Sequence, residues 1–189
     1  MNFADLLDRL DTLLQQLRPD YYATLNPPAP VAEIVALEAE FGLVLPPELQ
    51  LWFGWRNGQQ GFDNFFQNNG LQSVSSAAAT MRVNCKMLAA EEFVPNWWGP
   101  AWVPFLENGG GDHICLDLEG SFTGRPGQVL QHWHDWEPRS VLFPDLTSWL
   151  TAVVHTYEQA GTAAPLSEDD VVNFKPEYPA GFPQEFEAG

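Results

Sequence analysis

Four short strand-like segments follow one another in the second half of the chain, each separated from the next by a turn. They span residues 102–106, 113–118, 128–134 and 140–143. Glycine-rich stretches at 109–112 and 120–127 supply the first two connections. Strands joined by such turns pair with their neighbours in an antiparallel meander. The order of these segments therefore limits the fold to one that contains such a sheet.

Apolar residues recur at helical spacing before and after these strands. In the first such segment, Leu6, Leu10 and Leu13 share one face, and Pro19 is expected to end the helix. Gly42 stands where a helix commonly ends in a left-handed residue. The expected helices are residues 3–17, residues 31–41, a helix opened by Leu45-Pro46-Pro47-Glu48 and ended by Asn57-Gly58, residues 74–90, and residues 146–157.

These elements predict an α+β fold. An antiparallel β-meander of about four to six strands is expected to pack against N-terminal helices and a C-terminal helix. The composition changes after residue 160, so we expect a domain at 1–160 and an acidic C-terminal extension at 161–189. The extension also carries aromatic rings, namely Phe174, Tyr178, Phe182 and Phe186. We expect it to lack regular structure but to lie partly against the domain.

The charge of the chain excludes some classes of partner. Twenty-five acidic side chains face eight basic ones, which gives a formal net charge of −17. Proteins that bind nucleic acid or anionic membranes need Lys and Arg to replace counterions, so neither is an expected partner. The negative field would instead steer a basic protein partner. The alternative is that the acidity serves only solubility.

Cys85 and Cys115 are the only cysteines, which is too few for a secreted disulfide framework. Whether they lie close in space is left open, although Cys115 stands in an apolar stretch typical of a small buried residue. The N-terminus has no basic segment followed by an apolar run, and no window is apolar enough to span a membrane. We therefore expect a cytoplasmic protein.

Several motifs occur in a distinctive order. In the first half the pattern is Ile34…Leu37-Glu38…Phe41-Gly42…Leu45-Pro46-Pro47…Leu49. In the second half it is Trp102-Val103-Pro104-Phe105, Gly109-Gly110-Gly111-Asp112, Cys115-Leu116-Asp117-Leu118, Gly124-Arg125-Pro126-Gly127-Gln128-Val129-Leu130 ending at His134-Asp135, and Leu146…Ser148-Trp149-Leu150. Over roughly residues 25 to 157 this order resembles the SUKH superfamily, which includes the fungal Smi/Knr cell-wall assembly regulators and many bacterial immunity proteins.

Two clusters of residues invite a chemical interpretation. His132, His134 and Asp135 would hold a metal ion if the two histidines share one face of a strand. His113, Cys115 and Asp117 also alternate along one strand, but residues two apart are about 6–7 Å apart between Cα atoms, too far for a ready Cys–His pair. We expect structural roles for both clusters. The prediction is no catalytic residue, no metal and no cofactor.

The resemblance implies a protein-binding module that is not an enzyme. The leading hypothesis is an immunity protein that neutralises a secreted bacterial toxin, such as a nuclease or deaminase, through a basic toxin domain. The alternatives are a regulatory or scaffold protein of the Smi/Knr type, and a metal-dependent enzyme acting through His132, His134 and Asp135. The partner contacts are predicted only from their positions in expected loops. These are Trp55, Asp63, Phe65, Trp98, Glu107, Asp112, Asp117 and Asp135. The oligomeric state is left open.

Overall fold

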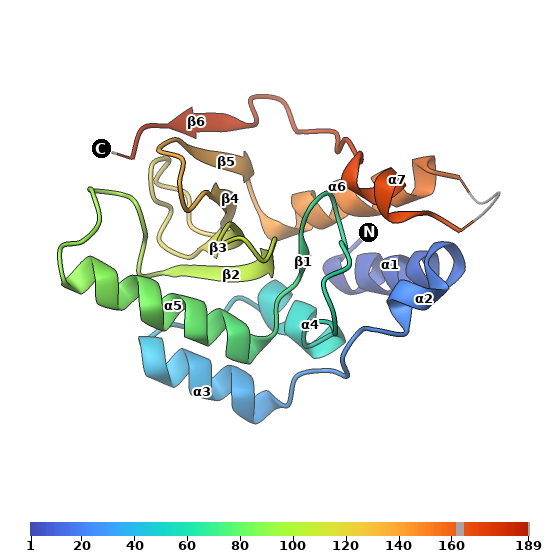
Figure 1. Ribbon diagram of the computed structural model, residues 1–189, viewed down its shortest axis with the longest axis horizontal. Helices are drawn as coiled ribbons and strands as arrows, with labels where there is room; N and C mark the ends of the chain where they lie inside the picture. Colours follow the sequence, from blue (N-terminus) through green and yellow to red (C-terminus); the bar gives the residue numbers. More distant parts are fainter. Residues whose placement is uncertain (162–164, 189) are drawn as a thin grey trace.

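A computed structural model describes residues 1–161 and 165–188. Four helices come first, a run of four consecutive strands follows the fifth helix, and the chain ends with two helices and a strand (Figure 1). The elements are α1 (Phe3–Leu17), α2 (Pro19–Tyr22), α3 (Val31–Phe41), α4 (Pro47–Trp55), β1 (Gly70–Leu71), α5 (Val74–Ala89), β2 (Trp102–Glu107), β3 (His113–Asp117), β4 (Gln128–His132), β5 (Arg139–Phe143), α6 (Leu146–Gln159), α7 (Glu168–Val172) and β6 (Gln184–Phe186).

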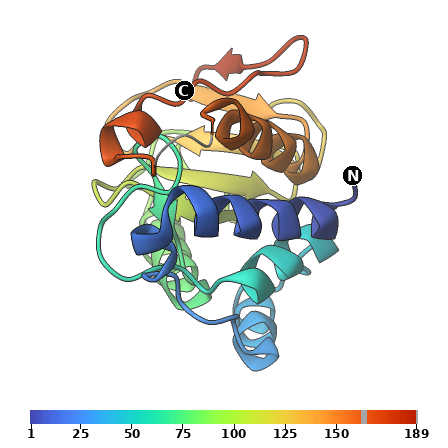
Figure 2. The ribbon, with the colours of Figure 1, turned by 90° about the vertical axis from the view of Figure 1, so that its right-hand side faces the viewer.

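The six strands form one antiparallel sheet in which each strand pairs with its neighbour in sequence. This confirms the expected α+β meander. α5 contacts β2, α6 contacts β4 and β5, and α1 packs beside α6 (Figure 2). α3 lies against α4 and α5 at the edge of this helical layer.

Aromatic rings from three elements meet where the helices cover the sheet. Trp52 of α4, Phe105 of β2 and Trp149 of α6 contact one another edge to face, with ring centroids 4.9–5.9 Å apart. All three side chains are buried. Edge-to-face pairs of this kind add specific geometry to the large area that the rings bury. This contact fixes α4 and α6 over the middle of the sheet.

Helix boundaries follow local signals closely. α1 has a capping box in which Asn2 and Asp5 exchange hydrogen bonds. α3 ends at Gly42, whose φ of +66° is the left-handed conformation that glycine adopts without strain. Pro19 does end α1, but it also begins α2, because proline is compatible with the first position of a helix.

The structure differs from the sequence-based prediction of secondary structure in three places. The expected strand at 128–134 ends at His132, so the residues after it form a loop. The loop between α4 and α5 contains β1, which pairs with the end of β2. The C-terminal segment is not irregular: it forms α7 and then β6, which joins the sheet beside β5. Val171 and Phe174 of this segment are buried against the rest of the molecule.

Candidate partner-binding surface

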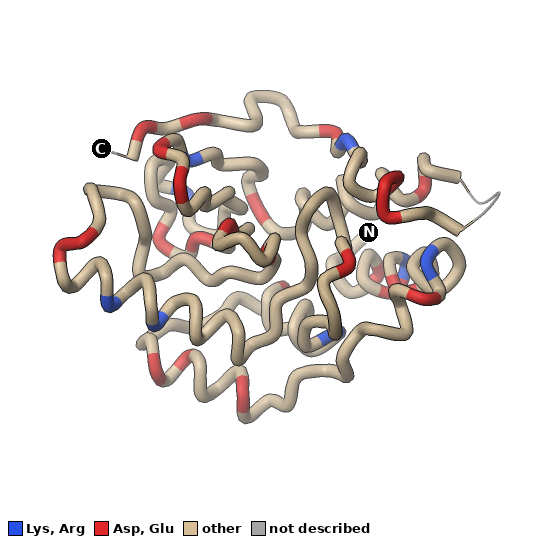
Figure 3. Tube along the Cα trace, in the orientation of Figure 1, with Lys and Arg blue, Asp and Glu red and all other residues tan. Residues whose placement is uncertain are grey.

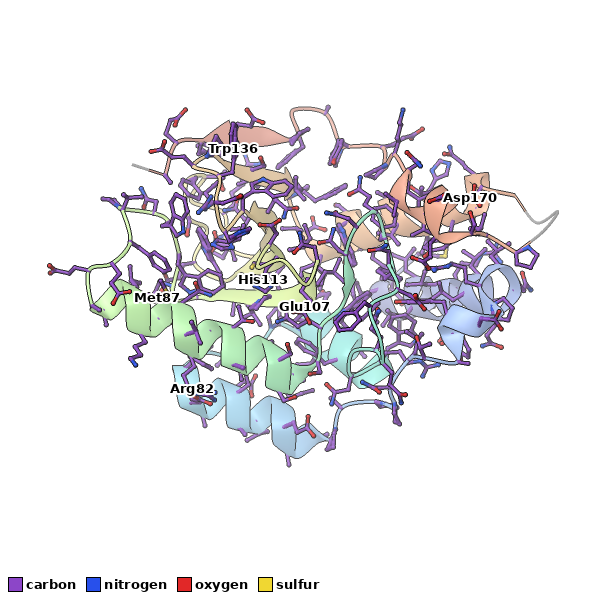
Figure 4. The ribbon with its side chains drawn as sticks, viewed as in Figure 1. Arg82, Met87, Glu107, His113, Trp136 and Asp170 are labelled. Atoms are coloured by element: carbon purple, nitrogen blue, oxygen red, sulfur yellow. The ribbon has the colours of Figure 1, made fainter. Side chains whose placement is uncertain are left out.

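A polar hollow of about 330 Å³ opens between the loop after α4 and the end of β2. It contains two of the expected contact residues, Asp63 and Glu107. Its lining consists of Gln59, Gly61, Phe62, Asp63, Asn64, Asn68, Gly70, Leu71, Glu107, Asn108 and Gly109. Figure 4 shows Glu107 at the end of β2, beside the start of β3 at His113, with which it is paired in the sheet. The hollow thus lies at one end of the sheet.

Phe62 stands at this hollow with 97% of its surface exposed, more than any other large apolar side chain in the described residues. Exposed aromatic rings in polar surroundings are characteristic of anchors in protein interfaces. Phe62 is not among the contact residues predicted from the sequence. A signal was present, since Gly61-Phe62-Asp63 places one large ring in a loop of glycine and polar residues.

Gln59 holds this loop in a defined shape. Its Oε1 accepts a hydrogen bond from the Tyr21 hydroxyl at 2.6 Å and another from the Leu71 backbone N–H at 2.8 Å. Its Nε2 donates to the Asp63 carbonyl at 2.5 Å. A Cβ atom on Gly70 would lie 3.0 Å from the Gln59 amide, so the side chain fits closely against the strand. The loop is therefore ordered before any partner arrives, which lowers the entropic cost of binding.

The far side of the same loop rests on α7 and the end of α1. The Glu168 carboxylate accepts from the Asn64 backbone N–H at 2.9 Å and also pairs with the Arg18 guanidinium. Arg18 donates to the Asn64 carbonyl and lies over the Tyr21 ring, 4.2 Å from its centroid. The C-terminal segment thus supports the loop that carries Phe62.

A second turn, at residues 108–112, borders the hollow. The Asn108 Oδ1 accepts from the backbone N–H groups of Gly110 at 2.8 Å and Asp112 at 3.1 Å, and its Nδ2 donates to Asp112 Oδ2 at 2.6 Å. Asp112 Oδ1 in turn accepts from the backbone N–H of His134 at 2.9 Å. This chain of contacts brings Asp112, and with it His134 and Asp135, onto the same end of the sheet as Asp63 and Glu107.

The carboxylates here differ in their acidity. Partial burial raises the pKa of Glu107 above its ordinary value, although a hydrogen bond with Ser76 opposes the change. Partial burial would also raise the pKa of Asp112, but hydrogen bonds from His134 and Asn108 outweigh it and bring the pKa below its ordinary value. The hydrogen bond to Asp112 raises the pKa of His134.

The remaining expected contacts lie elsewhere. Phe65, Trp98 and Asp117 are buried, at 0%, 2% and 0% exposure, and offer no surface to a partner in this conformation. Phe65 packs against Trp52, and Trp98 packs against the ring of His132. Phe65, Trp98 and Asp117 are therefore not included in the partner-binding surface proposed below.

Asp117 and Trp55 hold local structure. Asp117 accepts hydrogen bonds from three backbone N–H groups, those of Glu119, Gly120 and Ser121, at 2.6–3.0 Å, and so organises the turn after β3. Trp55, at the end of α4, donates from Nε1 to Asp11 at 2.8 Å. Trp55 does not line the hollow that contains Asp63 and Glu107.

The structure separates the residues of the expected metal cluster. His132 is buried at the end of β4, whereas His134 lies in the exposed loop that follows. Asp112, His134 and Asp135 do place one ligand atom each within 4.8 Å of one another. A metal ion there would have to replace the hydrogen bond that His134 Nδ1 makes with Asp112 Oδ1 at 2.9 Å. That hydrogen bond joins the loop after β4 to the turn before β3.

The second cluster is buried. Cys115 is fully buried, and burial raises the pKa of its thiol well above the ordinary value, which favours the protonated thiol. Burial also lowers the pKa of His113 to about 4. Asp117 is occupied by the turn after β3. Both cysteines are free thiols.

The comparisons with known proteins agree with this architecture. No curated protein matches the chain. Among the described residues, none lies in a helix long and apolar enough to cross a membrane. A family model matches residues 28–152, which include α3 to β5 and part of α6 and leave α1, α2, α7 and β6 outside. Because this match covers well over half of the sequence, the chain belongs to the SMI1 / KNR4 family (SUKH-1).

Proposed function

We propose that this protein is an immunity protein, which binds and neutralises a toxin through a basic domain of that toxin. Membership in the family is consistent with a toxin-immunity role or a Smi/Knr-like protein-binding role. We assign the contact to the loop face, defined here as Phe62, Asp63, Glu107 and Asp135; the expected contact Asp112 is buried beneath it and supports the turn before β3. The observation that carries this assignment is the almost fully exposed ring of Phe62 beside a hollow lined by Asp63 and Glu107.

The distribution of charge supports a cationic partner. Four of the eight basic side chains, Arg9, Arg18, Arg56 and Arg82, form ion pairs with carboxylates of the chain itself. Within residues 1–161 and 165–188, neither Asp63 nor Glu107 pairs with Lys or Arg. Figure 3 shows more acidic than basic positions, with the acidic ones on helices, strands and loops. A basic surface would therefore meet uncompensated negative charge on the loop face.

The proposed role requires binding and no catalysis. The carboxylates of the loop face would pair with the Lys and Arg side chains that a nuclease uses to hold nucleic acid, while Phe62 would enter an apolar pocket. A complex that neutralises a toxin must be tight, so we expect a dissociation constant of about 1 nM or lower, which corresponds to about −12 kcal/mol. The central ring is expected to contribute more than the acids at the rim.

Co-expression with the product of the neighbouring gene tests the proposal. Cells that express this product as a toxin should survive when the wild-type chain is present. Phe62→Ser should weaken the complex roughly 30-fold or more, because interface anchors contribute about 2 kcal/mol or more. Val44→Ser serves as the matched control, since Val44 is 83% exposed and lies outside the loop face. Isothermal titration calorimetry of the purified pair gives the two affinities.

Two results would count against an immunity function. The first is that no neighbouring product is toxic or is bound by the chain. The second is a pull-down that returns a host assembly and depends on Phe62, which would favour the regulatory or scaffold role. A metal-dependent enzyme predicts a chelator-sensitive melting temperature, whereas the proposal predicts that a chelator leaves it unchanged.

A further inference from the structure

A second surface lies between α1, α3 and α4, where the helices enclose a groove of about 660 Å³. Leu7 and Ile34 are buried at its base. Val31, Val35 and Leu51 line it and remain 75%, 53% and 44% exposed. The groove shares no lining residue with the hollow of the loop face. It is therefore a separate feature of the molecule.

The exposed apolar side chains exceed what the core requires. On α3, Ile34 and Leu37 already face the core, so Val31 and Val35 form a second apolar row one turn apart on the exposed side. On α4, Leu49 and Trp52 are buried, whereas Leu51 points to the groove. A helix that only covers a core carries polar residues on its outer face. A contiguous apolar surface of this kind marks a site of interaction.

Carboxylates accompany this apolar surface. Asp8 and Glu38 belong to the lining of the groove, and none of its lining residues is Lys or Arg. Glu38 Oε1 is fixed by the Leu45 backbone N–H, which donates to it at 2.8 Å. The nearby Arg56 is neutralised by Asp11 at 2.8 Å. An occupant therefore meets an apolar base beside uncompensated negative charge.

We propose that this groove binds one amphipathic helix of a partner protein, with Lys or Arg flanking its apolar row. None of the lining residues belongs to a strand, so the groove offers no strand edge for an extended peptide. The walls are mostly helices, which offer few free backbone groups to a partner, so a bound segment must largely satisfy its own backbone hydrogen bonds, as a helix does. Cationic flanks match Asp8 and Glu38.

A second copy of this chain fits the groove less well. The whole molecule carries a formal charge of −17, and α3 itself contains Glu33, Glu38 and Glu40 without a basic residue. Docking α3 of one copy into the groove of another would bring like charges together. The family match includes α3 and α4 but not α1, so one wall of the groove lies outside the matched region. The inference goes beyond the proposed function and does not depend on it.

Fluorescence anisotropy with a designed peptide tests this inference. The probe is a labelled helical peptide of about 18 residues, with Leu spaced i, i+3, i+4 and i+7 and with Lys on the flanking positions. One control peptide has the same composition in scrambled order, and a second has Glu in place of Lys. We expect the wild-type chain to bind the probe at least about tenfold more tightly than either control.

Substitutions in the groove locate the binding. Val35→Asp and Leu51→Asp should each lower the affinity for the probe peptide about tenfold or more, because each places a charge on the apolar surface. Val83→Asp is the matched control: Val83 is 58% exposed, lies on α5 outside the groove and gains the same charge. Circular dichroism and melting temperature verify that the variants fold. Phe62→Ser should leave the binding of this probe unchanged.

Three outcomes would overturn the inference. One is equal affinity for the ordered and scrambled peptides, since binding would then reflect charge alone. Another is unchanged affinity in Val35→Asp. The third is sedimentation showing that the wild-type chain associates with itself and that Val35→Asp is monomeric, in which case a second copy occupies the groove.

Discussion

The ring nitrogen Nδ1 of His134 lies 2.9 Å from Oδ1 of Asp112, and the backbone N–H of His134 donates to the same oxygen at 2.9 Å. One carboxylate thereby joins the loop after β4 to the turn before β3. Asp112 is buried beneath the loop face, while His134 is exposed on it. The pair fixes the relative position of two segments that are distant in sequence.

This contact predicts a shifted titration of His134. Its pKa should lie above the ordinary value of about 6.5, and Asp112→Asn should lower it, because the hydrogen bond and the charge of Asp112 favour the imidazolium. The associated stabilisation is present at low pH and is lost as the pH rises through the raised pKa. NMR titration of the histidine ring measures both values. An equal midpoint in the two proteins would contradict the prediction.

The two buried histidines predict the opposite dependence on pH. Burial lowers the pKa of His132 to about 3 and that of His113 to about 4, and the positive charge of Arg139 lowers the value for His132 further. The nearby Asp112 opposes both shifts. Because the unfolded chain takes up protons near pH 6.5 and the folded chain does not, the free energy of unfolding should fall as the pH falls below that value.

Urea denaturation measures this loss. Between pH 7 and pH 4 the two histidines should reduce the free energy of unfolding by roughly 3–6 kcal/mol. His132→Phe keeps an aromatic ring against Trp98 and should remove about half of the dependence. A variant with the same pH profile as the wild type would show that His132 is charged or solvated in the folded state.

Arg139 is buried and, among the residues that the structure describes, forms no ion pair with a carboxylate. Its guanidinium donates to the carbonyl groups of Trp97 at 3.0 Å and Trp136 at 2.6 Å, and it lies over the Trp97 ring. Burial lowers its pKa to about 10, so it stays charged at neutral pH. Arg139→Lys should destabilise the fold by roughly 2–4 kcal/mol, because an ammonium group cannot reach both carbonyls.

Thermal and chemical denaturation test this expectation against Arg125→Lys. Arg125 is exposed in the turn before β4, so its replacement should change stability by no more than about 0.5 kcal/mol. Equal stability of the two variants would mean that the carbonyls around Arg139 find other donors. It would also mean that the hydrogen bonds of Arg139 do not hold the loop 133–138 in place.

Phe174 predicts how the C-terminal segment behaves. Its ring lies 4.9 Å from that of Tyr157 and 5.6 Å from that of Phe66, between centroids. We propose that the extension expected at 161–189 forms part of the folded unit over its described residues, 161 and 165–188; residues 162–164 and 189 lie outside the described residues. Phe174→Ala should then cost roughly 2–4 kcal/mol through the cavity it leaves. Val172→Ala, in the same segment but 44% exposed, is the control and should have little effect. A neutral Phe174→Ala would indicate a detached tail.

Asp117 predicts the stability of the turn after β3. Asp117→Ala would leave three buried or partly buried N–H groups without their acceptor, together with the Gln128 amide that donates at 2.8 Å. We expect a loss of roughly 2–4 kcal/mol in the free energy of unfolding. Glu119→Ala, two residues further along and exposed, should be close to neutral in the same urea titration. Similar losses in both variants would contradict the role given to Asp117.

Much of the fold could be predicted because its signals are local. The helix Val31–Phe41 has the expected bounds, since Pro30 precedes it and Gly42 ends it. β2 to β5 begin and end within two residues of the expected positions, and glycine turns separate β2 from β3 and β3 from β4. The elements missed, α2, β1, α7 and β6, are all short. β1 and β6 hold their place through pairing with distant strands, which no local pattern records.

The candidate site was harder to predict. Loop position predicted Asp63 and Glu107 as contacts, and both line the same hollow. It also predicted Phe65 and Trp98, whose side chains are buried. An aromatic residue in a loop gives the same sequence pattern whether its side chain is buried in the core or exposed to solvent. Phe62 and Phe65 lie three residues apart, and their exposures are 97% and 0%.

The sequence by itself determined the order of helices and strands, the meander and the excess of negative charge, because periodicity, turn residues and composition act over short stretches of chain. Only the tertiary structure decided which side chains remain at the surface. That outcome depends on contacts between distant segments, such as Gln59 with Tyr21 and Leu71, or Asp112 with His134. Burial is a property of the whole packed molecule, so the loop face and the groove became visible only when the chain was folded.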